Sequence, residues 1–454
     1  QMIQFLLAAP RSGSGKTTLT CALLAALKKR RYTPCAFKSG PDYIDPMFHR
    51  SALQVDSHNL DLYLSEKQTV QTLYAQYAAG HGAAVCEGAM GFYDGQGLST
   101  TASAWELADT LGLPVLLVLQ PKGASLTLAA EIRGLQAFRT PSHLAGILLN
   151  DCSQKLYDLL KPMLEQETGL PVLGFLPHLP EAVIESRHLG LKTAGEIAGL
   201  QQKIDLLADT LSAHLDWDRL AALTEKPVPV VSGRVQTSAG QTSVRIAVAR
   251  DEAFCFTYAE TLDALRLAGA ELVFFSPVQD AALPAGISGL YLPGGYPELY
   301  ARQLSENTSM RTAIRKAVLA GLPTVAECGG FLYLGQALEA ADGTSWPMAG
   351  VLSGSGIRAG RLVRFGYAAM TAQTDSMLFR AGETLHIHEF HHWDSTDNGT
   401  DFSIRKSEKQ QWYGGFASAS LYAGFPHLYW AGTPLPRRFV DAAAHYQQQK
   451  RNDK

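Results

Sequence analysis

The sequence lacks an excess of charge of either sign. Its 454 residues include 39 Lys and Arg against 42 Asp and Glu, which gives a net charge of -3. This balance offers no electrostatic reason to bind nucleic acid or an anionic membrane, so we expect neither as a partner. Any anion that the protein binds must be held by a local arrangement of residues.

Paired cysteines and long apolar runs are also missing. The six cysteines include no CxxC pair, which indicates neither a disulfide framework nor a zinc site and favours a reducing cytoplasm. Apolar runs such as residues 113–119 are too short to cross a bilayer, and the first residues lack the basic segment of a secretory signal. We therefore expect a cytoplasmic protein.

The length and the hydrophobic content of 46% predict a globular chain of two domains. Residues 224–243 are rich in Pro, Ser, Gly and Thr and show no sustained helical or strand periodicity, which is typical of a linker. We predict a first domain over residues 1–223 and a second over residues 244–454.

The first domain begins with a pattern typical of phosphate binding. An apolar run stops at Pro10, helical spacing follows Thr17, and PRSGSGKTT lies between them. Gly13 and Gly15 let the backbone N–H groups curl towards a phosphate, Lys16 would reach the β and γ phosphates, and the Thr17 hydroxyl would bind Mg²⁺. The usual motif begins with glycine where Pro10 stands. A glycine-rich turn without nucleotide is the alternative, but the GKTT ending favours nucleotide binding.

Two later strand ends carry carboxylates. Residues 37–49, FKSGPDYIDPMFH, place Lys38, Asp42 and Asp45 in a proline-rich loop, and Glu87 ends the apolar stretch AAVCE. Ligands of open α/β sheets bind at such carboxyl ends, and Glu87 could complete a Mg²⁺ shell. Solvated turns with exposed acids are the alternative. With the buried strands LPVLLVLQ and LAGILLND, the pattern predicts a doubly wound parallel sheet.

The second domain places a cysteine at a strand end. LPTVAECGG reads as a buried strand that ends in a tight turn, and a helical segment follows. This geometry predicts that Cys328 is an exposed, strained nucleophile whose thiolate is favoured by the helix N-terminus. A buried structural cysteine is the alternative. The unhindered N–H groups of Gly294, Gly295 and Gly329 could form an oxyanion hole.

Five motifs resemble those of the cobyrinic acid a,c-diamide synthase family: FKSGPDYIDP, EGAMGFYDG, SRHLGL, LPGGYPE and AECGGFLYL. The resemblance implies a P-loop, dethiobiotin-synthetase-like sheet joined to a class I glutamine-amidotransferase-like α/β domain. It also implies ATP- and Mg²⁺-dependent amidation of the a and c acetate carboxylates of cobyrinate, through an acyl phosphate, in cobalamin biosynthesis. The ammonia would come from hydrolysis of L-glutamine.

The resemblance also assigns residues, and His427 falls in the segment that supplies the amidotransferase histidine. The residues implied at the nucleotide are Gly13, Ser14, Gly15, Lys16, Thr17, Thr18 and Asn150. Those implied at the metal are Thr17, Asp45 and Glu87. Those implied at the corrinoid are Lys38, Asp42, Tyr43, Arg187 and His188. HIHEFHHW, residues 386–393, is interpreted as lining the substrate cleft and not as a zinc site, because neighbouring strand residues point to opposite faces.

One position departs from the wider amidotransferase pattern. A Glu commonly stands two residues after the histidine, and this chain has Tyr429 there. The sequence therefore predicts a Cys328 and His427 dyad with another acceptor orienting the imidazole.

Other functions stay open at this point. The same chemistry could act on hydrogenobyrinate or nickel sirohydrochlorin. A P-loop switch, a partition ATPase or a non-catalytic binding module would explain only part of the motifs. The sequence also leaves open whether the chain forms a homodimer.

Overall fold

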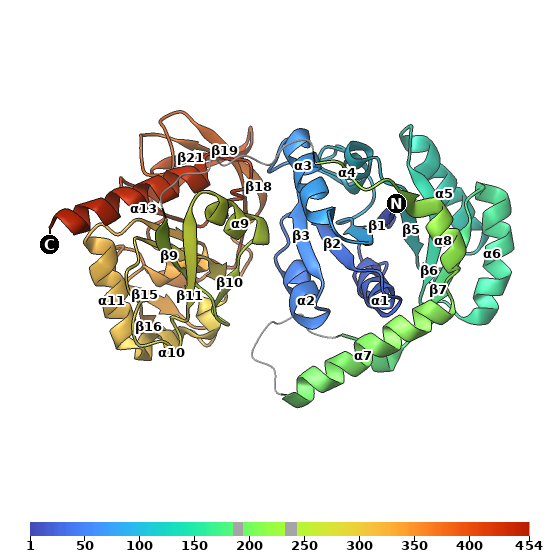
Figure 1. Ribbon diagram of the computed structural model, residues 1–454, viewed down its shortest axis with the longest axis horizontal. Coiled ribbons are helices and arrows are strands. Elements are labelled where there is room, and N and C mark those ends of the chain that lie inside the picture. The colour runs from blue at the N-terminus through green and yellow to red at the C-terminus, as the bar shows by residue number, and fades with distance from the viewer. Residues whose placement is uncertain (185–193, 232–242, 454) are drawn as a thin grey trace. The chain divides into compact units, whose positions relative to one another are not determined.

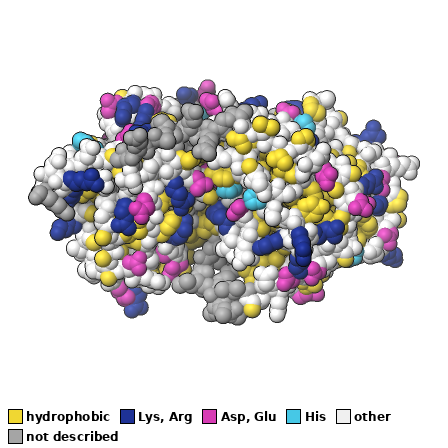
Figure 2. All heavy atoms as spheres, viewed as in Figure 1, with side chains coloured by type: hydrophobic (Ala, Val, Ile, Leu, Met, Phe, Trp, Pro, Cys, Tyr) yellow, Lys and Arg dark blue, Asp and Glu magenta, His cyan; other side chains and the backbone are white. Residues whose placement is uncertain are grey.

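The computed structural model describes residues 1–184, 194–231 and 243–453, and the chain divides into two compact units, Gln1–Arg234 and Val235–Lys454 (Figure 1). On the face shown in Figure 2, positive and negative side chains are interspersed, as the balanced composition predicts. Within the described ranges, no helix is both long enough and apolar enough to span a membrane.

The first unit contains an eight-stranded sheet in the order β3-β2-β4-β1-β5-β6-β7, with β8 antiparallel to β1 and the other pairs parallel. The strands are β1 (Met2–Ala8), β2 (Pro34–Ser39), β3 (Asp56–Leu60), β4 (Ala83–Glu87), β5 (Val115–Leu119), β6 (Leu144–Asn150), β7 (Val172–Leu176) and β8 (Glu225–Lys226). The strand order reverses beside β1, and a ligand crevice forms outside the carboxyl ends at such a point. The predicted doubly wound sheet is confirmed.

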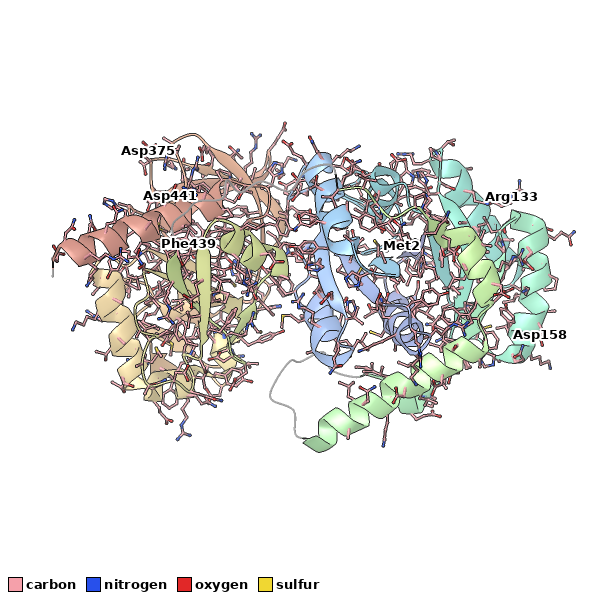
Figure 3. All side chains as sticks on the ribbon, in the orientation of Figure 1. Met2, Arg133, Asp158, Asp375, Phe439 and Asp441 are labelled. Atoms are coloured by element: carbon pink, nitrogen blue, oxygen red, sulfur yellow. The ribbon has the colours of Figure 1, made fainter. Side chains whose placement is uncertain are left out.

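Helices cover this sheet and bury most of its strands completely. The helices are α1 (Lys16–Lys29), α2 (Ile44–Ala52), α3 (Lys67–Ala78), α4 (Ala104–Leu111), α5 (Leu126–Phe138), α6 (Gln154–Thr168), α7 (Ala194–Ala213) and α8 (Trp217–Thr224), with a 3₁₀ turn at Pro180–Ala182. Ile3, Phe5 and Leu7 pack in one core with residues of α1 and α7. Charged residues lie on the outer helix faces, as Arg133 and Asp158 show (Figure 3).

The predicted linker begins inside the first unit. Thr224 ends α8, and Glu225–Lys226 form β8, which pairs with Met2 and Ile3 of β1. The short strand forms because the chain runs beside a free stretch of β1, which local periodicity does not reveal. Residues 232–242 of the linker lie outside the described residues.

The second unit contains a six-stranded sheet in the order β11-β9-β12-β14-β24-β23, parallel except for β23. Its strands are β9 (Val244–Ala249), β11 (Ala270–Phe275), β12 (Gly289–Leu292), β14 (Thr324–Glu327), β23 (Phe416–Ala417) and β24 (Leu421–Gly424). Its helices are α9 (Ala259–Leu267), α10 (Ala301–Glu306), α11 (Thr308–Leu319), α12 (Gly329–Tyr333) and α13 (Leu435–Asn452), with a 3₁₀ turn at Pro297–Leu299. Phe439 of α13 is fully buried against the sheet (Figure 3).

The chain between α12 and β23 forms two smaller sheets, and an additional strand pair precedes α12. One has the order β16-β15-β17-β20, and another the order β19-β18-β21-β22, while β10 pairs with β13. Their strands are β10 (Phe254–Phe256), β13 (Gly294–Gly295), β15 (Ala337–Glu339), β16 (Ser345–Pro347), β17 (Gly356–Arg358), β18 (Arg364–Ala372), β19 (Thr384–His391), β20 (Trp393–Ser395), β21 (Phe402–Ser407) and β22 (Gln410–Gly414). Met370, Ile387 and Phe402 bring the second of these sheets into the core of the unit.

Candidate active sites

The loop between β1 and α1 has the backbone shape that its glycines predict. Gly13 and Gly15 have φ values of 82° and 92°, in the left-handed region that favours glycine. A Cβ on Gly15 would lie 2.0 Å from Asn150 Nδ2, so a side chain there would collide with the end of β6. Asn150 Nδ2 donates to the Ser14 carbonyl at 3.3 Å, which places Asn150 directly against the loop.

Lys16 lies at the start of α1 with its side chain buried. Its Nζ donates to the carbonyl of Met90, which follows β4 in the chain. Burial and the nearby Lys38 ammonium lower the pKa of Lys16 to about 8. The second threonine of the motif, Thr18, is exposed on α1. The ammonium of Lys16 therefore lies between the loop after β1 and the loop after β4, where a phosphate chain would run.

Two of the predicted residues, Thr17 and Lys38, contact the carboxylate of Glu87. Glu87 ends β4, and its Oε1 accepts from Thr17 Oγ1 at 2.8 Å and from Lys38 Nζ at 3.0 Å. Lys38 Nζ also forms an ion pair with Asp45 Oδ2 at 2.9 Å. Glu87 Oε2 is buried and accepts no hydrogen bond from the described residues. The family resemblance assigned Lys38 to the corrinoid. In the structure, its ammonium lies between the carboxylates of Asp45 and Glu87.

This donor set fits Mg²⁺. One hydroxyl and two carboxylates are hard oxygen ligands, and Mg²⁺ in nucleotide sites is usually held by one or two carboxylates together with phosphates. The unpartnered Glu87 Oε2 offers an additional oxygen. Burial lowers the pKa of Lys38, but Glu87 and Asp45 outweigh that effect and raise it above its usual value, so its ammonium balances their charge.

The other predicted substrate residues are only partly described. Asp42 Oδ1 accepts from the Ile44 N–H at 2.9 Å, and burial together with Asp45 raises the pKa of Asp42 to about 6. Tyr43 is buried beside it at the start of α2. Arg187 and His188 lie outside the described residues.

A cavity of about 170 Å³ adjoins the loop between β1 and α1. It is lined by residues 10–14, Leu119, Gln120, Lys122, Leu128 and Glu131.

In the second unit, Cys328 occupies a strained turn between β14 and α12. Its φ of 47° and ψ of -100° are unusual for a residue with a side chain, and its N–H donates to the Gly424 carbonyl at 2.8 Å. The prediction of an exposed thiol is wrong, because Cys328 is only 8% exposed. Burial, with Glu298 and Glu389 nearby, raises the pKa of the thiol instead of lowering it.

His427 and Cys328 both lie next to Gly294. A Cβ on Gly294 would lie 2.7 Å from His427 Cε1 and 3.5 Å from Cys328 Cβ, so the two side chains approach one small residue. A Cβ on Gly329 would lie 3.1 Å from the Gly295 nitrogen. The five residues that the sequence assigned to thiol chemistry are therefore neighbours.

The segment HIHEFHHW pairs with the backbone of His427. The His427 N–H donates to the His388 carbonyl at 2.8 Å, and the His388 N–H donates back at 3.4 Å. The residues alternate as predicted, because His386 is exposed whereas Glu389 is buried, where its Oε2 lies 3.2 Å from His391 Nε2. Burial, with His388 and His391 nearby, lowers the pKa of His427 to about 3, so its imidazole is neutral at physiological pH.

The sequence did not identify Glu298 and Glu389 as neighbours of the thiol. Both act electrostatically on Cys328, and burial raises the pKa of Glu298 to about 7. They lie in the motifs LPGGYPE and HIHEFHHW, but nothing in those motifs placed them beside Cys328.

Family models match both halves of the chain. Residues 5–190 match the CobQ/CobB/MinD/ParA nucleotide binding domain, and residues 245–434 match the CobB/CobQ-like glutamine amidotransferase domain. The chain is 40% identical to the cobyrinate a,c-diamide synthase of a Synechococcus species, over 96% of this chain and 97% of that protein. It is 38% identical to the Salmonella typhimurium protein of the same name, over 95% of each, and 35% identical to that of Listeria innocua, over 95% and 97%.

Proposed function

The chain belongs to the cobyrinate a,c-diamide synthase family, and we propose that it amidates the a and c acetate carboxylates of cobyrinate in cobalamin biosynthesis, with ATP and L-glutamine as co-substrates. One observation carries this proposal. A single chain holds a phosphate loop with buried carboxylates and, in its other unit, a strained cysteine beside a histidine. A ligase that uses glutamine needs both.

We assign the ATP and corrinoid chemistry to residues 1–223, and glutamine hydrolysis to residues 244–454. A carboxylate is a poor electrophile, so one of its oxygens first attacks the γ-phosphorus of ATP, which gives an acyl phosphate and ADP. Lys16 and the loop N–H groups bind the phosphates and offset the charge of the transition state.

Thr17, Asp45 and Glu87 are the residues that would hold Mg²⁺. The ion, when bound, neutralises phosphate charge. Lys38 pairs with Asp45 and Glu87, and its ammonium would be released towards an anionic substrate group if these carboxylates held a cation. We assign Lys38, Asp42, Tyr43, Arg187 and His188 to the corrinoid carboxylate site.

Ammonia is produced in the other unit. Cys328 sulfur attacks the glutamine side-chain amide while His427 accepts the thiol proton and passes it to the leaving nitrogen. N–H groups from Gly294, Gly295 and Gly329 stabilise the oxyanion. Water then hydrolyses the glutamyl thioester to glutamate, and the ammonia displaces phosphate from the acyl phosphate to form the amide.

A P-loop switch or partition ATPase explains the first unit equally well. It gives no role to the strained Cys328, to the adjacent His427 or to the glycines packed against them. The family models of both halves and the relatives over nearly the full length favour the ligase.

The proposal is tested by incubating the protein with ATP, Mg²⁺, glutamine and cobyrinate and following the tetrapyrrole by mass spectrometry. We expect two successive mass changes, each that of a hydroxyl replaced by an amino group, together with ADP and glutamate. Parallel incubations with hydrogenobyrinate and nickel sirohydrochlorin identify the preferred tetrapyrrole. If ATP and glutamine are consumed but no tetrapyrrole gains an amide, the proposed substrate is wrong.

A further inference from the structure

Glu327 is a buried carboxylate directly before the nucleophile. It ends β14, its side chain is fully buried, and Cys328 follows it in the chain. Side chains alternate along a strand, so Glu327 lies on the same face of the sheet as Val325. Val325, two residues before Glu327, packs in the core with Tyr291 and Trp430, whereas Cys328 packs in the core on the other face.

Three donors converge on this carboxylate. Glu327 Oε2 accepts from the Tyr291 hydroxyl at 2.9 Å. Its Oε1 accepts from the Leu428 N–H and from Trp430 Nε1, each at 3.3 Å. Leu428 is the residue after His427, and Trp430 lies three residues after it. The carboxylate therefore binds the segment that carries the histidine, on the side away from the thiol.

A carboxylate is an unfavourable choice for a core position. Burial raises the pKa of Glu327 to about 7, against the effect of the hydrogen bonds from Tyr291, Trp430 and Leu428. Val325, Tyr291 and Trp430, which lie near it in the chain or donate to it, belong to a buried hydrophobic core. An apolar residue in its place would leave three donors without this acceptor. The carboxylate therefore fixes the donors on either side of Tyr429, in the segment that carries His427.

The position where the wider amidotransferase pattern has an acid is occupied differently here. The residue two positions after the histidine is Tyr429, whose ring packs edge-on against Tyr258 with centroids 5.1 Å apart. The carboxylate is supplied from β14 instead, and it contacts the residues on both sides of Tyr429. One strand end thus carries the nucleophile on one face and, on the other, the group that binds the segment of the base.

We propose that Glu327 is a positioning residue that fixes His427 relative to Cys328 during glutamine hydrolysis. The inference rests on the proposed glutaminase activity of the second unit. The proposed positioning role requires a hydrogen-bond acceptor at position 327 and does not require a charge. A side-chain amide would satisfy it, with its oxygen accepting from Leu428 and Trp430 and its nitrogen donating to the Tyr291 hydroxyl.

Two variants of the full-length protein separate positioning from folding. Glu327→Leu keeps the volume but removes every acceptor, and Glu327→Gln keeps an acceptor. For each, glutamate release gives kcat and the KM for glutamine, and a glutamine-like chloroketone that alkylates Cys328 gives the fraction of competent sites. Misfolding lowers that fraction, whereas misplacement of His427 lowers kcat at an unchanged fraction.

We expect Glu327→Leu to lower kcat about 100-fold, because misplacing a catalytic group by about 1 Å has an effect of that order. The KM and the competent fraction should stay close to those of the wild type. Glu327→Gln should recover most of the lost rate. Tyr291→Phe, which removes the one donor outside the histidine segment, should have a much smaller effect than Glu327→Leu.

Three results would overturn the inference: a Leu variant close to wild-type kcat, a loss that follows the competent fraction, or a Gln variant as slow as Leu. A wild-type protein that releases no glutamate would instead contradict the proposed function itself. The wild-type assay therefore distinguishes the two failures.

Discussion

The two sites treat charge in opposite ways. Around β1 and β4, charged side chains are gathered and paired, with the ammonium of Lys38 between Asp45 and Glu87 and the ammonium of Lys16 beside them. At the end of β14, the reacting groups are a thiol and an imidazole, both buried and both neutral. The first arrangement is suited to an anionic nucleotide, and the second to a neutral amide.

The difference follows from what each reaction needs at its start. Phosphates arrive charged, so fixed cations and N–H groups can bind them before any bond changes. A thiol paired with a neutral histidine moves its proton only when the bound amide accepts the sulfur. Burial keeps Cys328 and His427 in these uncharged forms until then, because it disfavours the thiolate and imidazolium alike.

The largest effect should separate the sites completely. Cys328→Ala should lower glutamate release by at least about 1000-fold, as loss of a covalent nucleophile does. Amidation supported by added ammonium salt should remain, because the acyl phosphate forms in the other unit. Glutamate release and tetrapyrrole mass measure the two activities in one sample. Equal loss with both nitrogen sources would contradict the division of labour.

The converse change should leave the thiol site intact. Lys16→Ala removes the ammonium beside the loop after β4, so amidation should fall about 100- to 1000-fold with either glutamine or ammonia. Alkylation of Cys328 by the glutamine-like chloroketone should proceed as in the wild type, which serves as the matched measurement. Loss of that labelling would show that the units are less independent than the comparison implies.

A smaller effect should come from crowding the thiol site. Gly294→Ala adds a methyl group that would lie 2.7 Å from His427 Cε1, so the imidazole must shift and kcat for glutamate release should fall about 10-fold. Gly134→Ala in α5 is the control, because its methyl group meets no atom within 4 Å. If Gly294→Ala has wild-type kcat, His427 is not held as closely as the structure indicates.

The last effect concerns pH and stability and not a reaction rate. The folded pKa of His427 lies near 3 and its ordinary value near 6.5, so below pH 6.5 the unfolded chain binds the proton more strongly. The stability that neutral His427 contributes is present above pH 6.5 and is lost as pH falls towards 3, by about 2 kcal/mol at pH 5. Burial depresses the pKa of His388 to about 4, in the same direction.

Hydrogen exchange in peptides of β14 and β24, corrected for intrinsic rates, measures this loss between pH 7 and pH 5. His427→Gln should reduce it, whereas substitution of the exposed His386 should not. An unchanged loss in His427→Gln would show that the burial of His427 does not govern the acid sensitivity of this unit.

The proximity of residues in the first unit could be predicted because parallel strands place their carboxyl ends at one edge. Thr17 and Glu87, far apart in the chain, could be expected to meet for that reason alone. The strain at Cys328 followed from a strand that ends at two glycines. His427, by contrast, was found only through the family resemblance.

Features set by long-range packing were not predictable. Whether Cys328 is exposed depends on residues far from it in the chain, because it packs in one core with Leu292 and Phe425. The position of Lys38 between two carboxylates depends on the pairing of β2 with β4. Glu327 lies in the motif LPTVAECGG, but its partners Leu428 and Trp430 lie more than a hundred residues away.

The burial of Cys328 has a consequence for the durability of the enzyme. Peroxide and disulfides react with sulfur mainly when it is ionised and accessible. A protonated thiol that is 8% exposed is therefore oxidised slowly, although Cys328 is a free cysteine. The sulfur can thus stay protonated and shielded from oxidants until a substrate is bound beside it.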